Sequence, residues 1–177
     1  MNQQYWEKFY KTFKVTKYSS FAEFCVKYLK KSEKIIDLGC GNGRDSYFFA
    51  KHGFEVVGID IASRPEYKKN AIFFQNDFMH YDSFLHPVYA RFFLHSISDN
   101  DIIQLFQKSR DMLLLEFRDK SDHPVIYKHL RNHVDGNQII KSLVENNFDI
   151  LFYQKSKGLA VFKEEDPLIC RVIAKRK

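Results

Sequence analysis

Residues 34–45 read Lys34-Ile35-Ile36-Asp37-Leu38-Gly39-Cys40-Gly41-Asn42-Gly43-Arg44-Asp45, and this stretch decides the fold. It begins with a short apolar run of the kind that forms a buried strand. Glycines then alternate at positions 39, 41 and 43, where they allow a positive φ and let a ligand approach the backbone closely. A helix is expected next, from Asp45 to His52, ending at Gly53. The pattern predicts a strand, a glycine-rich turn and a helix in direct succession.

A second strand is expected immediately afterwards, from Phe54 to Ile61, with Asp60 near its end. The free N–H groups at the start of the preceding helix favour a negatively charged group. An acid at the tip of the second strand can accept hydrogen bonds from both hydroxyls of a ribose. We therefore expect a βαβ unit that binds a nucleoside-containing ligand, with an ordinary tight β–α turn as the alternative.

The spacing of the glycines distinguishes two classes of ligand. The dinucleotide fingerprint G-x-G-x-x-G requires a third glycine where this chain has Arg44. The pattern from Asp37 to Gly43 is instead D-x-G-x-G-x-G, which resembles the first motif of class I S-adenosylmethionine (SAM) methyltransferases. Within that class, residues 39–46 (GCGNGRDS) are similar to the small-molecule branch that includes tellurite-resistance and thiopurine-type enzymes.

This resemblance implies a fold and a cofactor. The fold is a Rossmann-like, seven-stranded, mostly parallel sheet with helices on both faces and an antiparallel last strand. One domain spans residues 1–177, with an N-terminal helical lid over residues 1–31, and SAM is the cofactor. The residues that the resemblance and the surrounding pattern assign to cofactor binding are Trp6, Tyr10, Asp37, Gly39, Gly41, Gly43, Arg44, Asp60, Ile61, Asp77 and Phe78.

Three of these assignments have alternatives. Trp6 and Tyr10 lie on an aromatic helical face that either packs on the domain or covers the bound cofactor. Asp77 ends an expected third strand, Ile72 to Phe78, and matches the acid that meets the adenine amino group in the family. It could equally be an ordinary turn residue.

A fourth strand and the turn after it are expected from Pro87 to His95. Ligands of open α/β sheets bind at the carboxyl ends of strands, so Arg91 is expected close to the methyl acceptor. A guanidinium group there suggests an anionic acceptor held by bidentate hydrogen bonds, and a structural ion pair is the alternative. His95 could act as a general base or as a buried polar group.

A fifth apolar strand, Met112 to Leu115, runs directly into Glu116 and Arg118. These charges could hold a substrate or form a salt bridge, and Glu116 is a second candidate base. The catalytic candidates are thus Arg91, His95, Glu116 and Arg118.

The polar connection from Asp119 to Gly136 is expected to be a substrate-binding insertion. Its His129 and His133 could share a helix face, but the sequence places no Cys or carboxylate to complete a metal site, so none is expected. Upstream, Ser20 and Glu23 have the spacing of a helix capping box.

Composition sets further bounds. A chain of 177 residues suggests a single domain, and no apolar run reaches the roughly 20 residues of a transmembrane helix. The three cysteines are widely spaced and indicate buried free thiols in a reducing cytoplasm. The net charge of +6 permits an RNA partner, but the lysine clusters adjoin turns and chain ends, so nucleic acid is not the expected partner.

The expected activity is methyl transfer from SAM to an oxygen of a small anionic or sugar-linked metabolite. Residues 5–10, 91–95 and 115–118 are also similar to methyltransferases of bacterial capsular polysaccharide loci, which implies a polysaccharide precursor with a phosphate or phosphoramidate acceptor. The alternatives are an RNA methyltransferase and a non-catalytic SAM-binding module that partners another protein.

Overall fold

A computed structural model describes residues 3–12, 15–62, 65–122, 132 and 134–177 of the chain. The elements follow one another as α1 (Gln3–Thr12), α2 (Ser20–Cys25), η1 (Val26–Tyr28), β1 (Lys34–Leu38), α3 (Arg44–Lys51), β2 (Glu55–Asp60), β3 (Ala71–Gln75), η2 (Phe78–His80), β4 (Val88–Arg91), η3 (Leu94–Ser96), α4 (Asp99–Lys108), β5 (Met112–Arg118), α5 (Gly136–Glu145), β6 (Phe148–Ser156) and β7 (Ile169–Arg176).

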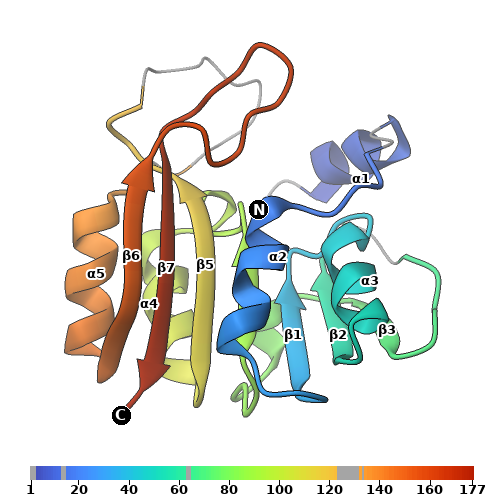
Figure 1. The fold of residues 1–177 in the computed structure, drawn as a ribbon, viewed down its shortest axis with the longest axis horizontal. Coiled ribbons are helices and arrows are strands. Elements are labelled where there is room, and N and C mark those ends of the chain that lie inside the picture. Colours follow the sequence, from blue (N-terminus) through green and yellow to red (C-terminus); the bar gives the residue numbers. More distant parts are fainter. Residues whose placement is uncertain (1–2, 13–14, 63–64, 123–131, 133) are drawn as a thin grey trace.

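The strands form one seven-stranded sheet in the order β3-β2-β1-β4-β5-β7-β6 (Figure 1). Strands β1 to β5 run parallel, whereas β7 runs antiparallel to both β5 and β6. The predicted mostly parallel sheet with an antiparallel last strand is confirmed. The strand order reverses between β1 and β4, and in open α/β sheets such a switch point is where ligands bind, outside the carboxyl ends of the strands.

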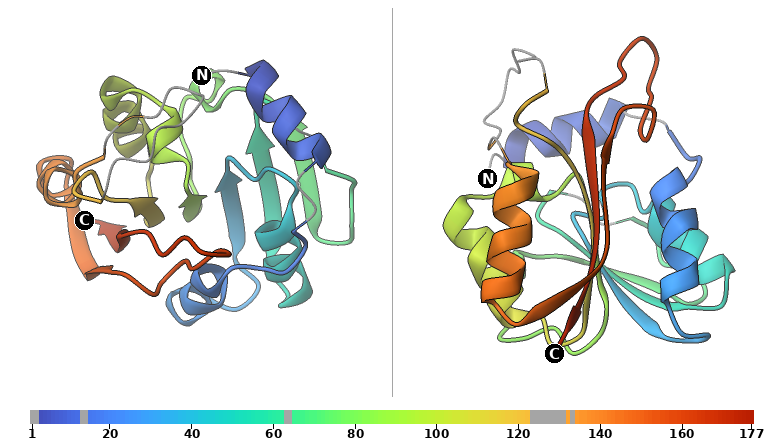
Figure 2. Two further views of the ribbon diagram at one scale, coloured as in Figure 1. Left: turned by 90° about the horizontal axis from the view of Figure 1, so that it is seen from above. Right: turned by 60° about the vertical axis from the view of Figure 1, so that its left-hand side comes forward.

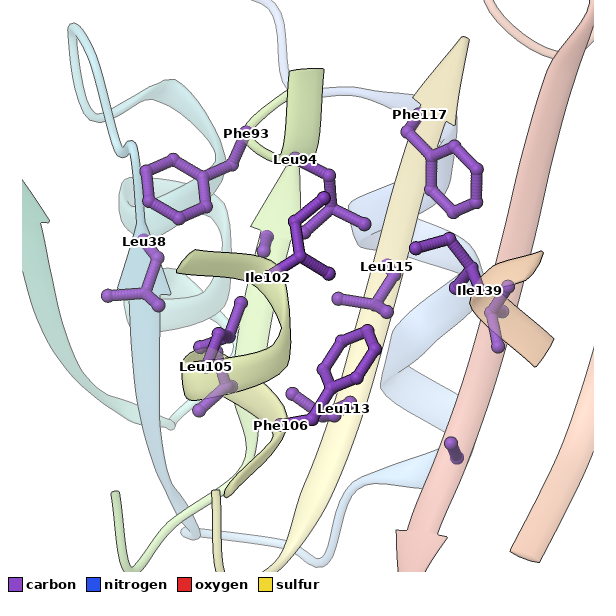
Figure 3. Close-up of a cluster of buried hydrophobic side chains, with 14 of the residues drawn as sticks. Leu38, Phe93, Leu94, Ile102, Leu105, Phe106, Leu113, Leu115, Phe117 and Ile139 are labelled. Atoms are coloured by element: carbon purple, nitrogen blue, oxygen red, sulfur yellow. The ribbon is translucent and has the colours of Figure 1, made fainter. Parts of the chain in front are cut away.

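Helices cover both faces of the sheet, with α2 and α3 on one side and α4 and α5 on the other (Figure 2). Consecutive residues of β5 therefore serve different cores, because side chains alternate along a strand. Leu114 belongs to the core under α2 and α3, and Leu115 to the core under α4 and α5. The latter core includes Phe106 and Phe117 (Figure 3). Burial on both faces explains the nearly continuous apolar runs of these strands.

Strand β3 ends earlier than the sequence predicts, whereas β4 and the turn after it lie within the predicted range Pro87 to His95. Strand β4 ends at Arg91 because Phe92 has φ = 54°, and η3 follows at Leu94. The N–H of Phe92 donates to the carbonyl of Glu116 at 2.7 Å, which fixes this bend. Strand β3 ends at Gln75, and Asp77 caps the short helix η2 instead of ending the strand.

Helix α2 begins differently from the prediction. Ser19 is the N-cap, and its side chain accepts a hydrogen bond from the N–H of Ala22. The predicted capping role of Ser20 is therefore wrong, and its hydroxyl is available for another contact. Helix α1 lies beyond the ends of β1 and β2 (Figure 1), and no helix of the described ranges is long and apolar enough to cross a membrane.

Candidate cofactor and acceptor site

The glycine turn after β1 requires its glycines. Gly39, Gly41 and Gly43 have φ values of 68°, 56° and 76°, in the left-handed region that other residues rarely adopt. The N–H of Gly39 donates to the carbonyl of Ile59 at 2.8 Å, which joins the turn to β2. A Cβ on Gly41 would lie 2.6 Å from the ring of Tyr10. The sequence at these positions thus permits both the turn and the close approach of another group.

Asp60 lies at this turn, at the tip of β2. Its carboxylate accepts hydrogen bonds from the N–H of Gly41 at 3.0 Å and of Ala62 at 2.8 Å. The side chain is largely buried, so the turn and the acid form one compact polar edge. Ile61 follows, half-buried, and its carbonyl accepts from Gln75 Nε2 at 3.3 Å. A buried carboxylate beside a turn of glycines is consistent with a ligand that has ribose hydroxyls, and the contact of Asp60 with a ribose stays a prediction.

Asp37 faces the protein interior. Its side chain is 3% exposed and accepts a hydrogen bond from the hydroxyl of Ser46 in α3. Burial raises the pKa of Asp37 to about 7, and the charges of Asp45 and Asp60 act in the same direction. The contact with Ser46 joins β1 to α3 across the turn, while direct contact of Asp37 with a cofactor stays a prediction.

Asp77 and Phe78 are the residues predicted to contact the adenine ring. Asp77 accepts from the N–H of Met79 at 3.0 Å, and Phe78 is buried. The Phe78 ring meets Phe93 edge-on at 5.4 Å, and Phe93 in turn contacts the backbone at Gly39. The structure therefore brings Phe78 near the glycine turn through Phe93, and the adenine contacts stay predictions.

The N-terminal helix contacts the glycine turn directly. Tyr10 lies against Gly41, and Trp6 stacks on Tyr10 at 6.0 Å between ring centroids. Burial, together with the charge of Asp60, raises the pKa of the Tyr10 phenol. The connection after α1 is held from the same turn, because Asn42 Nδ2 donates to the carbonyl of Val15 at 2.7 Å.

On the acceptor side, the ends of three adjacent strands carry a row of charges. Arg91 of β4 is in register with Glu116 of β5, and Glu116 is in register with Arg171 of β7. Arg91 Nε lies 2.6 Å from Glu116 Oε1, and Arg171 Nε lies 2.7 Å from Oε2. Glu116 is fully buried, with each oxygen engaged by a different guanidinium group. Both carboxylate oxygens of Glu116 are thus engaged in ion pairs, and its role as a base stays a prediction.

Only the Nε edge of the Arg91 guanidinium is used in the ion pair with Glu116 that the structure describes. Its side chain is 16% exposed, and its guanidinium lies 4.2 Å from the centroid of the Phe92 ring. Among the described residues, no group accepts a hydrogen bond from its Nη atoms. Arg44 is close enough that the charge of Arg91, after burial itself, lowers the pKa of Arg44. The two alternatives considered for Arg91 are therefore compatible: the Nε edge forms an ion pair, and the Nη edge remains for an anion.

The other two catalytic candidates, Arg118 and His95, have different neighbours. Arg118 pairs with Glu165 at 2.6 Å, in the connection between β6 and β7. His95 is buried in η3, with its ring 5.7 Å from that of Phe92. The roles of both residues in catalysis stay predictions.

Arg171 was not identified from the sequence. It lies within an apolar strand near the end of the chain, and only its register opposite Glu116 connects it with the site. An arginine inside an otherwise buried strand was the available signal, because such residues are rarely buried without a partner.

No group of three potential metal ligands occurs within the part of the chain that the structure describes. His129 and His133, with most of the predicted substrate-binding insertion, lie outside the described residues.

Comparisons with solved structures identify the same fold. A SAM-dependent methyltransferase from Methanosarcina mazei superposes with a TM-score of 0.70 at 18% identity, covering 86% of this chain and 96% of that one. Magnesium protoporphyrin IX methyltransferase from Synechocystis, crystallised with SAM, gives 0.65 at 18% identity, covering 97% and 79%. The 1,6-didemethyltoxoflavin-N1-methyltransferase of Burkholderia thailandensis, with S-adenosylhomocysteine, gives 0.69 at 15% identity, covering 89% and 76%.

At such low identity these structures support the fold alone. Among curated protein sequences, none matches the chain significantly. The sequence family described as a methyltransferase domain matches residues 6–114, which is more than half of the chain. This match includes most of α1, the glycine turn, Asp60 and Arg91. The chain therefore belongs to the methyltransferase-domain family.

Proposed function

We propose that this chain is a SAM-dependent methyltransferase that methylates an oxygen of a small anionic or sugar-linked metabolite. The observation that carries the proposal is Arg91 at the end of β4: its side chain is partly exposed, and its Nη atoms donate to no group among the described residues. This strand borders β1, which leads into the glycine turn, so an anion at Arg91 would lie beside the cofactor edge of the sheet. The family assignment and the buried carboxylate of Asp60 support SAM as the cofactor.

In methyl transfer from SAM, the main task of the protein is to position the acceptor. When bound, SAM supplies a methyl group on a sulfonium centre, whose departure leaves a neutral thioether. The residues of the chain must therefore hold an acceptor oxygen in line with that methyl group. A phosphate or carboxylate oxygen is already ionised and needs no base. If the acceptor is a hydroxyl, His95 and Glu116 are the candidate bases, and because both are buried the acceptor must reach below the surface.

A precursor of capsular polysaccharide, with a phosphate or phosphoramidate acceptor, is the more specific form of the proposal. It rests on the resemblance of residues 5–10, 91–95 and 115–118 and on the open edge of Arg91. All three cysteines are free and buried, which fits a reducing compartment such as the cytoplasm.

The test is methyl transfer from labelled SAM to phosphorylated and sugar-linked acceptors, with SAM binding measured separately by calorimetry. Asp60→Ala should weaken SAM binding by about 1–3 kcal/mol, because the ribose hydroxyls of SAM would lose the carboxylate that accepts their hydrogen bonds. Asp149→Ala is the control, since this aspartate is exposed on β6 and its nearest cation is Lys177 at 3.5 Å.

Each outcome has a distinct meaning. SAM affinity that is unchanged in Asp60→Ala would contradict the ribose assignment. Tight SAM binding without label in any acceptor would favour the non-catalytic module. Label that appears in RNA, with affinity that falls steeply as salt is raised, would favour the RNA methyltransferase.

A further inference from the structure

Three cross-strand neighbours form a single unit beside the proposed acceptor position. Arg91, Glu116 and Arg171 occupy matching register positions on β4, β5 and β7. They continue the face on which Tyr89, Leu114 and Ile173 form the core under α2 and α3, two residues earlier or later on each strand. Side chains at such positions are direct neighbours, so the row is a consequence of register rather than of side-chain flexibility.

Arg171 is anchored from several directions. Its Nη2 atom donates to the hydroxyl of Ser20 at 2.8 Å and to the carbonyl of Leu159 at 3.0 Å. Its guanidinium also lies 5.3 Å from the centroid of the Phe21 ring. Arg171 is therefore a fixed cation that binds Oε2 of Glu116 from the side of β7. This contact orients the carboxylate so that Oε1 faces Arg91. Because Ser19 caps α2, the hydroxyl of Ser20 takes no part in capping and accepts the hydrogen bond from Arg171.

Arg91 is restrained on its other sides as well. Glu116 holds its Nε edge, and the Phe92 ring covers one face of its guanidinium. Phe92 reaches this position through a positive φ, which is costly for a bulky residue and is found where the surrounding structure imposes it. What remains is the fork of Nη atoms, the edge with which arginine binds oxyanions.

The net charge of Arg91, Glu116 and Arg171 favours the binding of one anion. Two guanidinium groups share the single carboxylate of Glu116, so the row carries one unbalanced positive charge. We propose that Glu116 and Arg171 are positioning residues that hold Arg91 with its Nη fork open to an oxyanion of the methyl acceptor. This inference rests on the proposed function, and it names the recognised group as a phosphate or a carboxylate.

Arginine side-chain NMR of the complex with S-adenosylhomocysteine tests the proposal directly. The Nε–H signals of Arg91 and Arg171 should exchange slowly with solvent, because both donate to buried Glu116. Titration with inorganic phosphate, and separately with acetate, should shift the Arg91 signals and leave those of Arg171 nearly unchanged. The stronger of the two responses identifies the class of oxyanion.

Variants separate positioning from charge. Arg171→Gln removes the unbalanced charge and the anchor, and should weaken anion binding about tenfold while S-adenosylhomocysteine affinity stays the same. The double variant Glu116→Gln/Arg171→Gln keeps one positive charge on Arg91 but loses the clamp, and it should remain as weak. Arg171→Lys should recover part of the affinity.

Lys155→Gln is the matched control, because it breaks another ion pair at the same end of the sheet, 2.8 Å from Asp119, without touching the row. Anion binding in this variant should equal that of the wild type. A thermal melt of each variant establishes that it is folded.

The proposal has clear contrary outcomes. If neither phosphate nor acetate shifts an Arg91 signal, the anion site does not exist. If the double variant binds the anion as well as the wild type, Arg171 acts by charge alone and the positioning role is overturned. If the wild type fails to bind S-adenosylhomocysteine, the proposed function itself fails, and this inference with it.

Discussion

Two buried aspartates near the glycine turn differ in the hydrogen bonds that their carboxylates accept. Asp45 accepts hydrogen bonds from the N–H and hydroxyl of Ser19, at 2.7 and 2.8 Å, and from the Tyr89 hydroxyl at 2.7 Å. Asp37 is buried as deeply, but Ser46 is its only side-chain partner among the described residues. A buried charge with few donors favours its neutral form, which is the physical reason why the pKa of Asp37 is raised to about 7.

This raised pKa predicts a pH dependence of stability. The folded protein holds the Asp37 proton up to about pH 7, whereas an unfolded aspartate releases it near pH 3.9. The contribution of Asp37 is therefore fully present below its unfolded pKa, and it is lost as the pH rises toward 7. Wild type should lose up to about 1.4 kcal/mol per pH unit relative to Asp37→Asn across this range.

Urea denaturation of both proteins at a series of pH values measures the difference. Asp149→Asn is the control, because its carboxylate is exposed on β6. Wild-type and Asp37→Asn curves that stay parallel over the range would show that Asp37 is ionised in the folded protein.

Helix α1 is the element most directly linked to the glycine turn. Its Tyr10 ring covers Gly41, and the residues after the helix are held by Asn42 and by Arg44, whose Nη1 donates to the carbonyl of Lys17 at 3.3 Å. The contact of Tyr10 with Gly41 is consistent with the predicted lid, which stays a prediction. Aromatic rings suit this role because they bury a large apolar area with few rotatable bonds.

If α1 is a lid, Tyr10→Ala should mainly accelerate SAM dissociation. We expect an increase of about tenfold in the dissociation rate, which corresponds to about 1.4 kcal/mol of lost contact energy, with little change in association. Stopped-flow measurements that use the fluorescence of Trp6 can follow both rates. Tyr10→Phe, which keeps the ring, and Lys11→Ala, on the exposed side of the same helix, should behave like the wild type. Tighter binding of SAM to Tyr10→Ala would mean that the ring blocks the site.

At the scale of the whole molecule, one sheet joins two separate cores. The core under α4 and α5 and the core under α2 and α3 contain different residues, and they share no helix among these four. Among the described residues, the strands of the sheet contribute side chains to both cores. Because Leu114 and Leu115 are adjacent and both fully buried, they offer a matched comparison of the two cores.

Leu114→Ala and Leu115→Ala should each lower the free energy of unfolding by about 2–5 kcal/mol, the range for a buried leucine that leaves a cavity. If the sheet makes the molecule cooperative, far-ultraviolet circular dichroism and tyrosine fluorescence should report the same transition in both variants. A variant in which one signal is lost before the other would show that the two cores unfold separately.

The sequence alone determined the features that are local along the chain. The glycine turn, the strands on either side of it and the acid at the tip of β2 lie within residues 34–61, and the confirmed sheet follows from strands and helices whose patterns are visible in short windows. Local patterns are reliable here because φ freedom and burial act on neighbouring residues.

The tertiary structure decided which charged groups meet. Glu116 and Arg171 are 55 residues apart, and the antiparallel register of β7 brings them together. Ser20 is 151 residues from Arg171, and the packing of α2 in the same core as β7 brings these two together. The choice of Ser19 over Ser20 as the cap, and the bend at Phe92 that ends β4, also depend on distant partners. The sequence proposes which side chains could bind or react, but the pairing of strands determines which of their atoms are already engaged and which remain open, because that pairing is a property of the folded sheet.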